Sequence, residues 1–107
     1  DMVISGGVNL YPVEAEQVLL GHPDVADVAC IGVPHREMGE ELKALVVMVD
    51  PGKRLEEDEL LNYCRKRLSH HKSPRSVTLV QDLGRTSMGK IDKRKLRSPW
   101  WDEAGAD

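Results

Sequence analysis

Two apolar segments constrain the fold of this chain more than any other feature: residues 25–33 (VADVACIGV) and 42–49 (LKALVVMV). Both are rich in β-branched residues, which favour an extended backbone, so each segment predicts a β-strand. Pro34 is expected to end the first strand, and an Asp-Pro-Gly turn at 50–52 is expected to end the second. At 107 residues the chain suits one domain, so we expect a single modest core that includes these strands.

Apolar residues at helical spacing mark two further segments. One begins at Pro12, which suits a first helical turn because that position leaves its N–H unpaired, and it stops at Gly21. The other covers residues 55–68, with its apolar residues on one side. We expect both helices to pack on the sheet.

Two adjacent glycines, Gly6 and Gly7, separate the short apolar runs 2–5 and 8–11. Glycine supplies the positive φ angles that tight reversals need, so this segment predicts a two-stranded ribbon. Two interpretations of the pair stay open. A plain hairpin turn is the more common use of such glycines, but they also let a backbone approach a ligand closely.

The remaining pattern completes an α+β layout. Residues 76–80 (SVTLV) predict a third strand, 92–96 predict a short helix, and 98–107 predict an exposed C-terminal tail. The expected fold is a small three-stranded sheet flanked by helices, plus an N-terminal two-stranded ribbon. One domain, residues 1–97, carries all of these elements.

Charge is segregated along the chain, whose formal net charge is −3. Residues 37–59 are mainly acidic, whereas 85–97 carry six basic residues against one acidic residue. A basic segment can bind nucleic acid, but no aromatic residue interleaves this one, so a base-stacking surface is not expected. A small phosphorylated ligand fits the pattern better.

Cysteine usage and hydropathy indicate a compartment. Cys30 and Cys64 lie in apolar segments without the spacing of metal ligands, which predicts reduced core thiols. No apolar run approaches the ~20 residues of a membrane span, and no signal peptide is visible, so we expect a cytoplasmic protein. The chain opens within a patterned segment and lacks an initiating Met, which predicts a piece of a longer protein.

The segment 86–90 (TSMGK) is a candidate for phosphate chemistry. It resembles half of a phosphate-binding loop, but Ile91 follows the lysine where a Walker motif needs Ser or Thr. Two interpretations again stay open. Lys90 is either a cation that its loop presents to an anion or part of a solvated basic loop.

Other polar segments are weaker candidates. Adjacent His70 and His71 point in different directions, and no Cys or carboxylate lies at ligand spacing, so no metal site is expected. Lys72 and Arg75 could still meet a phosphate. The acidic run at 56–59 lies at a helix start, where acids complement the helix dipole, so we assign it to capping and solubility, not to catalysis.

Four motifs together carry a resemblance to a known family: DMVISGGVNLYPVEAE (1–16), HPDVADVACIGVP (22–34), GEELKALVV (39–47) and GRTSMGKIDKRKLR (84–97). In order and spacing they resemble the C-terminal domain of acyl-CoA synthetases, within the adenylate-forming superfamily. The resemblance implies a reaction in two steps. A carboxylate attacks the α-phosphate of ATP with Mg²⁺, and coenzyme A then displaces AMP to form a thioester. Between the steps the small domain rotates on a large N-terminal domain.

The resemblance also implies roles for single residues. Lys90 matches the lysine that serves the first step. Gly6 and Gly7 match the segment that lines the pantetheine tunnel in the second step, and Lys72 and Arg75 match positions near the coenzyme A phosphates.

The implied partners are a large N-terminal domain of the same protein, a carboxylic acid (a fatty acid first of all), ATP with Mg²⁺ held mainly by that domain, and coenzyme A. Without that domain the present chain is expected to be catalytically inert.

At Met38, some relatives place an aromatic residue that stacks on the coenzyme A adenine. Two alternatives stay open: an adenylation domain that loads acyl groups onto a carrier protein, and a stand-alone module that binds anions or nucleic acid.

Overall fold

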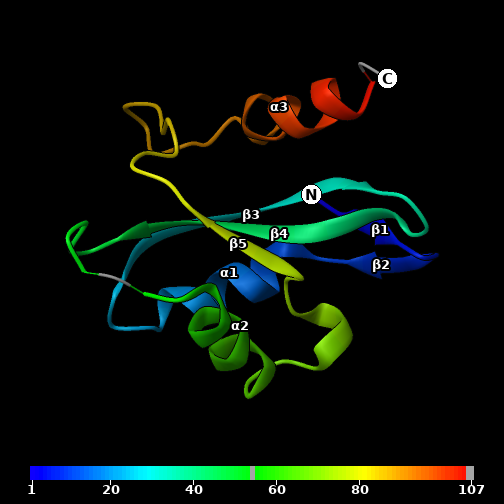
Figure 1. The fold of residues 1–107 in the computed structure, drawn as a ribbon. Coiled ribbons are helices and arrows are strands. Elements are labelled where there is room, and N and C mark those ends of the chain that lie inside the picture. Colours follow the sequence, from blue (N-terminus) through cyan, green and yellow to red (C-terminus); the bar gives the residue numbers. More distant parts are fainter. Residues whose placement is uncertain (54, 106–107) are drawn as a thin grey trace.

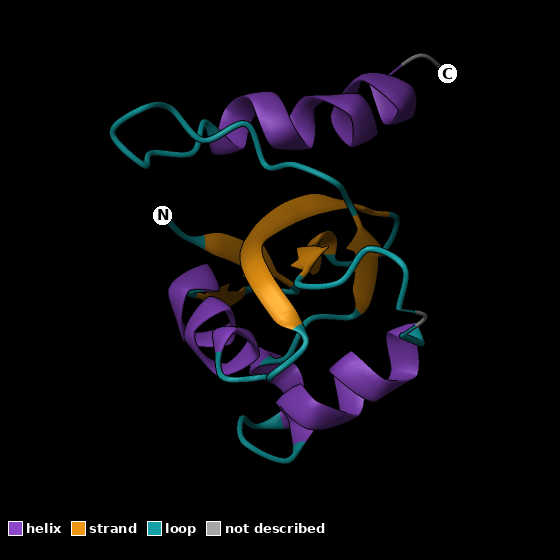
Figure 2. Cartoon of the chain, turned by 90° about the vertical axis from the view of Figure 1, so that its left-hand side faces the viewer, coloured by secondary structure: helices purple, strands orange, loops and turns teal. Residues whose placement is uncertain are grey.

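The computed structural model describes residues 1–53 and 55–105 of the chain (Figure 1). A sheet lies between two layers of helices, with α1 (Pro12–Leu20) and α2 (Glu57–Arg65) beneath it and α3 (Lys93–Gly105) above it in Figure 1. Figure 2 shows the same layers after a quarter turn. This mixture of helices and sheet confirms the predicted α+β class.

The two longest strands form the middle of the sheet, as the apolar segments predict. β3 (Val25–His35) pairs antiparallel with β4 (Gly39–Met48), and β5 (Ser76–Leu79) pairs in parallel with β4. In the described part of the chain no strand pairs with the outer side of β3, so β3 is an edge strand.

Pro34 does not end β3, contrary to the sequence-based expectation, because the strand continues to His35. Proline lacks an N–H and is tolerated where that group would face away from the sheet. Pro34 has the same parity along the strand as Cys30 and Gly32, whose backbone groups bond to side chains outside the sheet. The proline therefore removes no hydrogen bond of the ladder.

The predicted N-terminal ribbon consists of β1 (Val3–Ser5) and β2 (Val8–Leu10), paired antiparallel. It joins the sheet through one residue pair, Ser5 with Gly39 at the start of β4, which gives a five-stranded sheet. The attachment sets the β1–β2 turn beside the β3–β4 turn.

The larger apolar core lies between the sheet and the helices α1 and α2. It includes Leu19, Val46 and Leu60, all fully buried, and both cysteines, which are unpaired as predicted. Burial raises the pKa of the Cys30 and Cys64 thiols, so both stay protonated and unreactive. No helix within the described ranges is long and apolar enough to cross a membrane.

Helix α2 is shorter than the predicted helix at 55–68, although the predicted apolar stripe is right. Leu55 lies before the helix and is nevertheless buried in the core. Leu68 lies beyond the helix, yet its N–H donates to the Cys64 carbonyl at 2.8 Å and its side chain packs on the same core. The predicted apolar residues thus pack on one core even where they lie outside the helix.

Helix α3 is longer than predicted. The sequence predicts a helix at 92–96 and an exposed tail from 98, but the helix continues to Gly105. Its Leu96 and Trp100 side chains pack on a second, smaller core on the opposite face of the sheet, which supports the extra turns. Residues 101–105 are exposed as expected, and 106–107 lie outside the described residues.

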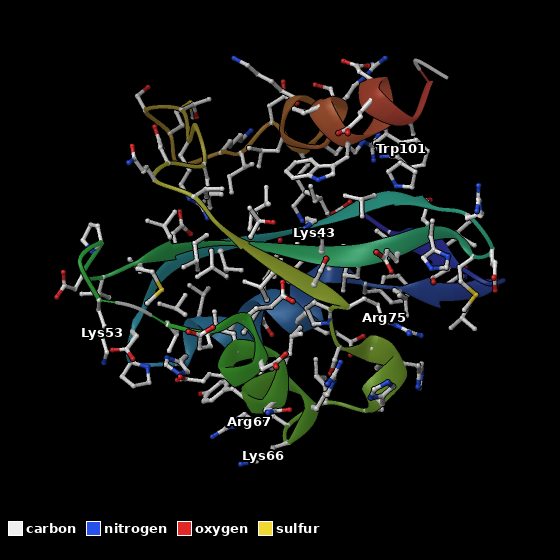
Figure 3. All side chains as sticks on the ribbon, in the orientation of Figure 1. Lys43, Lys53, Lys66, Arg67, Arg75 and Trp101 are labelled. Atoms are coloured by element: carbon white, nitrogen blue, oxygen red, sulfur yellow. The ribbon has the colours of Figure 1, made fainter. Side chains whose placement is uncertain are left out.

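Pro99 lies inside α3 and removes the N–H that would bond to the Lys95 carbonyl. The Ser98 hydroxyl donates to that carbonyl at 3.0 Å and replaces the missing bond. The next turn is tied to the sheet, because Nε1 of Trp101 donates to the Gly32 carbonyl at 2.9 Å. Figure 3 shows Trp101 on the side of α3 that faces the sheet.

Candidate functional site

Three of the predicted site residues lie at opposite ends of β3, with Lys90 near one end and Gly6 and Gly7 near the other. Asp27, near the start of the strand, bonds to the loop that carries Lys90, and His35, at its end, leads into the turn beside Gly6 and Gly7. Eight residue steps separate Asp27 from His35, which corresponds to roughly 25 Å of extended chain. In Figure 1 the lysine loop is the yellow and gold segment before α3, and the hairpin turn lies at the far end of the sheet.

Residues 86–90, here called the Lys90 turn, fold back on themselves. The Thr86 N–H donates to the Lys90 carbonyl and the Gly89 N–H donates to the Thr86 carbonyl, each at 2.8 Å. The Lys90 N–H also donates to Oγ1 of Thr86 at 3.2 Å. Gly89 has a φ of +82°, in the left-handed region that costs other residues about 1–2 kcal/mol. The glycine before the lysine is therefore required by the backbone of the turn.

Arg85 holds the Lys90 turn against β3. Its Nε and Nη2 donate to the two carboxylate oxygens of Asp27 at 2.6 and 2.7 Å, and its Nη1 donates to the Gly89 carbonyl at 2.6 Å. The hydrogen bond from Arg85 lowers the pKa of Asp27, and the same bond raises the pKa of Arg85. Both groups therefore keep their charges at neutral pH.

A hollow of about 610 Å³ lies beside the Lys90 turn, and its wall includes Asp1, Glu16, Lys90 and Lys93. Nζ of Lys93 lies 2.5 Å from the Asp1 carboxylate and 2.7 Å from that of Glu16, so its charge is compensated. Lys90 is exposed, as the sequence predicts, and its Nζ has no hydrogen bond or ion pair within residues 1–53 and 55–105. The hollow thus has a free ammonium at its wall, suited to an anion.

The β1–β2 turn, here called the glycine hairpin, depends on both of its glycines. Gly6 has a φ of +57° and Gly7 a φ of +82°, and the Gly6 N–H donates to the Met38 carbonyl at 2.9 Å. A Cβ on Gly6 would lie 2.9 Å from the Met38 thioether, whereas a Cβ on Gly7 would meet nothing within 4 Å. Gly7 therefore presents bare backbone to open space.

A small hollow of about 90 Å³ beside the glycine hairpin brings Gly6 and Arg75 together, with Met38 also in its wall. Figure 3 shows Arg75 before β5, at the hairpin end of the sheet. Lys72 does not share this hollow, since its Nζ lies 3.5 Å from the carboxylate of Glu14 on α1. Two of the predicted coenzyme A contacts therefore lie together, and Lys72 is paired elsewhere.

Sequence reasoning did not single out Asp27 or the tie from Arg85. A signal was present, because Asp27 is an acid inside the apolar segment 25–33. A charged residue in such a strand must face solvent or find a partner. The residue that pairs with it lies 58 positions away, which no local pattern reveals.

The comparisons with known proteins fit this fold. A family model described as AMP-binding enzyme C-terminal domain matches residues 14–90. The chain belongs to this family, as the resemblance of its motifs predicts.

The relatives and solved structures are similar to this chain over nearly its whole length. A feruloyl-CoA synthase from an Amycolatopsis species is 48% identical over 97 residues, which cover 91% of this chain and 20% of the relative. A long-chain-fatty-acid–CoA ligase from Escherichia coli O157:H7 is 41% identical over 97 residues, covering 91% of this chain and 17% of the relative. The solved structure of a Mycobacterium tuberculosis fatty acyl CoA synthetase superposes with a TM-score of 0.87 at 40% identity, covering 96% of this chain and 20% of that one.

The chain spans about a fifth of the length of the curated relatives it matches. The names of those relatives differ in the acyl group, since one is a feruloyl-CoA synthase and the other a long-chain-fatty-acid–CoA ligase. The matched segment is therefore shared among proteins named for different acyl groups.

Proposed function

We propose that this chain is the C-terminal domain of an ATP-dependent acyl-CoA synthetase. The whole protein converts a carboxylic acid and ATP to an acyl-adenylate and pyrophosphate, and coenzyme A then displaces AMP. Family membership and relatives named as a CoA ligase and a CoA synthase support this assignment. The observation that carries it is the Lys90 ammonium, which has no partner among the described residues and is held on a folded turn beside an open hollow.

Lys90 acts in the first step. Its ammonium meets the carboxylate of the acid and the α-phosphate of ATP, orients the attack, and offsets the charge that develops in the transition state. The role is electrostatic. ATP and Mg²⁺ are held mainly by the large domain, and the small domain supplies the cation when it docks.

The glycine hairpin acts in the second step. Gly6 and Gly7 form the wall past which the pantetheine arm of coenzyme A reaches the acyl-adenylate, since a side chain there would obstruct the thiol. Arg75 is exposed beside this hairpin and suits a coenzyme A phosphate. Lys72 serves the same phosphates if it exchanges its Glu14 partner for them.

The substrate we propose is a fatty acid of medium or long chain, and the enzyme works in the cytoplasm. The named fatty-acid ligases among the relatives support the substrate class. Coenzyme A is favoured over a carrier protein as the acceptor, because the names of the relatives reported above, a CoA ligase and a CoA synthase, both include CoA.

The test compares the two half-reactions in the full-length enzyme. Lys90→Ala should lower the rate of adenylate formation about a hundred- to a thousandfold, the usual loss of one charge-stabilising donor. Thioester formation from supplied acyl-adenylate should continue at the wild-type rate. Lys95→Ala, which removes an exposed lysine five residues away, serves as the control. Normal adenylation in Lys90→Ala would remove the basis of the proposal.

The 107-residue chain alone should form no thioester from MgATP, fatty acid and coenzyme A. The reason is that Lys90 is then a cation with no bound substrate to act upon. Sustained product formation by the purified chain would contradict this assignment.

A further inference from the structure

We propose that Arg85 is the positioning residue for Lys90. Its guanidinium ties the Gly89 carbonyl to Asp27 on β3 and so fixes the direction in which the lysine leaves its turn. The inference rests on the proposed role of Lys90 in adenylate formation.

The tie is a single planar group that satisfies three acceptor atoms. Two of its N–H groups bond to both oxygens of the Asp27 carboxylate, and a third bonds to the Gly89 carbonyl, all at 2.6 or 2.7 Å. Guanidinium donors lie in one rigid fork, so the positions of the carboxylate and the carbonyl become linked. Asp27 anchors the tie on the sheet, because it pairs with Val47 of β4, next to the irregularity in register between Val25 and Asp27.

The Gly89 carbonyl and the Lys90 N–H belong to one planar peptide unit. Arg85 bonds to the oxygen of this unit, and Oγ1 of Thr86 accepts from its N–H at 3.2 Å. With both polar atoms held, the orientation of the peptide is fixed. The Thr86 N–H holds the Lys90 carbonyl at 2.8 Å, so the peptides on both sides of the Lys90 Cα are fixed. Together they set where the Cα–Cβ bond of Lys90 points.

The turn needs such a tie because glycine gives it little stiffness of its own. Gly84, just before the turn, and Gly89, within it, both have positive φ angles, at +70° and +82°. Glycine populates many conformations with similar energy, so the local sequence alone does not select this one. The long-range bond to Asp27 does.

Arg85→Lys tests the tie without removing the charge. A lysine ammonium can still pair with Asp27, but it is a compact point charge that cannot hold the carboxylate and the Gly89 carbonyl in one plane. In the full-length enzyme, kcat for adenylate formation should fall between about ten- and a hundredfold, as expected when a catalytic group is misplaced by about 1 Å. KM for ATP and for the acid should stay within about twofold, because the lost interaction operates in the transition state.

Thioester formation from supplied acyl-adenylate should be unchanged in Arg85→Lys. Arg65→Lys is the matched control, since Arg65 is an exposed arginine at the end of α2, and neither half-reaction should change. An equal loss of both half-reactions in Arg85→Lys would overturn the proposal in favour of a general role in folding.

The combined variant separates positioning from direct contact with the substrate. On a Lys90→Ala background, Arg85→Lys should cause no further loss of adenylation, because residues that act through one another are not additive. A further loss of the same size as in the wild-type background would show that Arg85 acts independently of Lys90, and the proposal would fail.

Hydrogen exchange of the peptide 84–91 in the full-length enzyme gives a readout besides activity. Exchange should be faster in Arg85→Lys than in the wild type and in Arg65→Lys. If Lys90→Ala leaves adenylation normal, the proposed function fails while the exchange result still tests the tie. If Arg85→Lys exchanges and adenylates like the wild type, the tie is refuted and the role of Lys90 can stand.

Discussion

The Lys90 turn and the glycine hairpin both depend on glycine, but the first presents a charged side chain and the second presents bare backbone. Both use glycine at positive φ. The Lys90 turn is held by a charged side chain from outside and presents a free ammonium beside a hollow of about 610 Å³. The glycine hairpin is held by strand pairing and presents bare backbone beside a hollow of about 90 Å³. One end of the domain thus presents a positive charge, and the other presents a surface without side chains.

Among the glycine, stability and pH tests of this comparison, adding bulk to the hairpin should have the largest effect. Gly7→Leu in the full-length enzyme should slow thioester formation by about 100-fold or more, because a side chain there projects into open space where we place the thiol. The rate of adenylate formation, measured as pyrophosphate release, should stay close to that of the wild type. Gly7→Ala has the same backbone strain with little bulk and should lose far less. Parallel loss of both half-reactions would mean that the hairpin is only a structural turn.

Straining the lysine turn should have the next largest effect, now on the first step. Gly89→Ala places a Cβ at a φ of +82°, at a cost of about 1–2 kcal/mol, so the turn refolds and adenylation falls about tenfold. Gly84→Ala is the matched control, because Gly84 has a φ of +70° but lies outside residues 86–90. The same pyrophosphate-release assay should find a smaller loss there. Equal losses of adenylation in the two variants would show that the conformation of the Lys90 turn has no special role in this step.

Stability should separate the two lysines of the 610 Å³ hollow. Lys93→Ala should lower the free energy of unfolding by about 1 kcal/mol, because it leaves the Glu16 carboxylate with less charge compensation. Lys90→Ala should leave it unchanged, since the Lys90 ammonium has no partner to lose in the described part of the chain. Urea unfolding of the 107-residue chain measures both. A destabilised Lys90→Ala would reveal a structural role for that lysine.

The smallest effect should come from pH. The Asp27 pKa is lowered in the folded chain, chiefly by the Arg85 hydrogen bond, so its stabilisation is complete above the ordinary value of 3.8 and is lost as pH falls through the lower folded value. The pair is partly exposed, so Asp27→Asn should cost no more than about 1 kcal/mol at pH 7. The difference between wild type and variant in urea unfolding should shrink as pH falls below 3.8 and vanish below the lower folded pKa of Asp27. A constant gap would assign the effect to packing.

Local sequence patterns predicted which helices and strands form better than they predicted where each element ends. The apolar segments gave β3 and β4, and the glycine pair gave the hairpin, because these signals act over a few residues. The length of α3 was missed, since it depends on packing against β3 and on a Ser98 hydroxyl that replaces the bond lost at Pro99.

The same limit applies to the site. Lys90 and Gly89 stand in a recognisable motif, and the exposure of Lys90 followed from its polar surroundings. The tie between Arg85 and Asp27 joins residues 58 positions apart and becomes visible only once β3 is folded. Likewise Lys72 looked equivalent to Arg75 in the sequence, and the pairing with Glu14 on α1 separates them.

The side chains along the free edge of β3 also govern how this domain behaves among copies of itself. An unpaired strand edge is a template on which another chain can add a strand and begin to aggregate. Here the Asp27 carboxylate accepts from the Val28 N–H, Glu16 accepts from the Cys30 N–H, and the Trp101 indole donates to the Gly32 carbonyl. Alternate residues of the strand are thus occupied by partners from β3 itself and from the helices α1 and α3. These bonds protect the domain against edge-to-edge association along β3, the strand that runs between the Lys90 turn and the glycine hairpin.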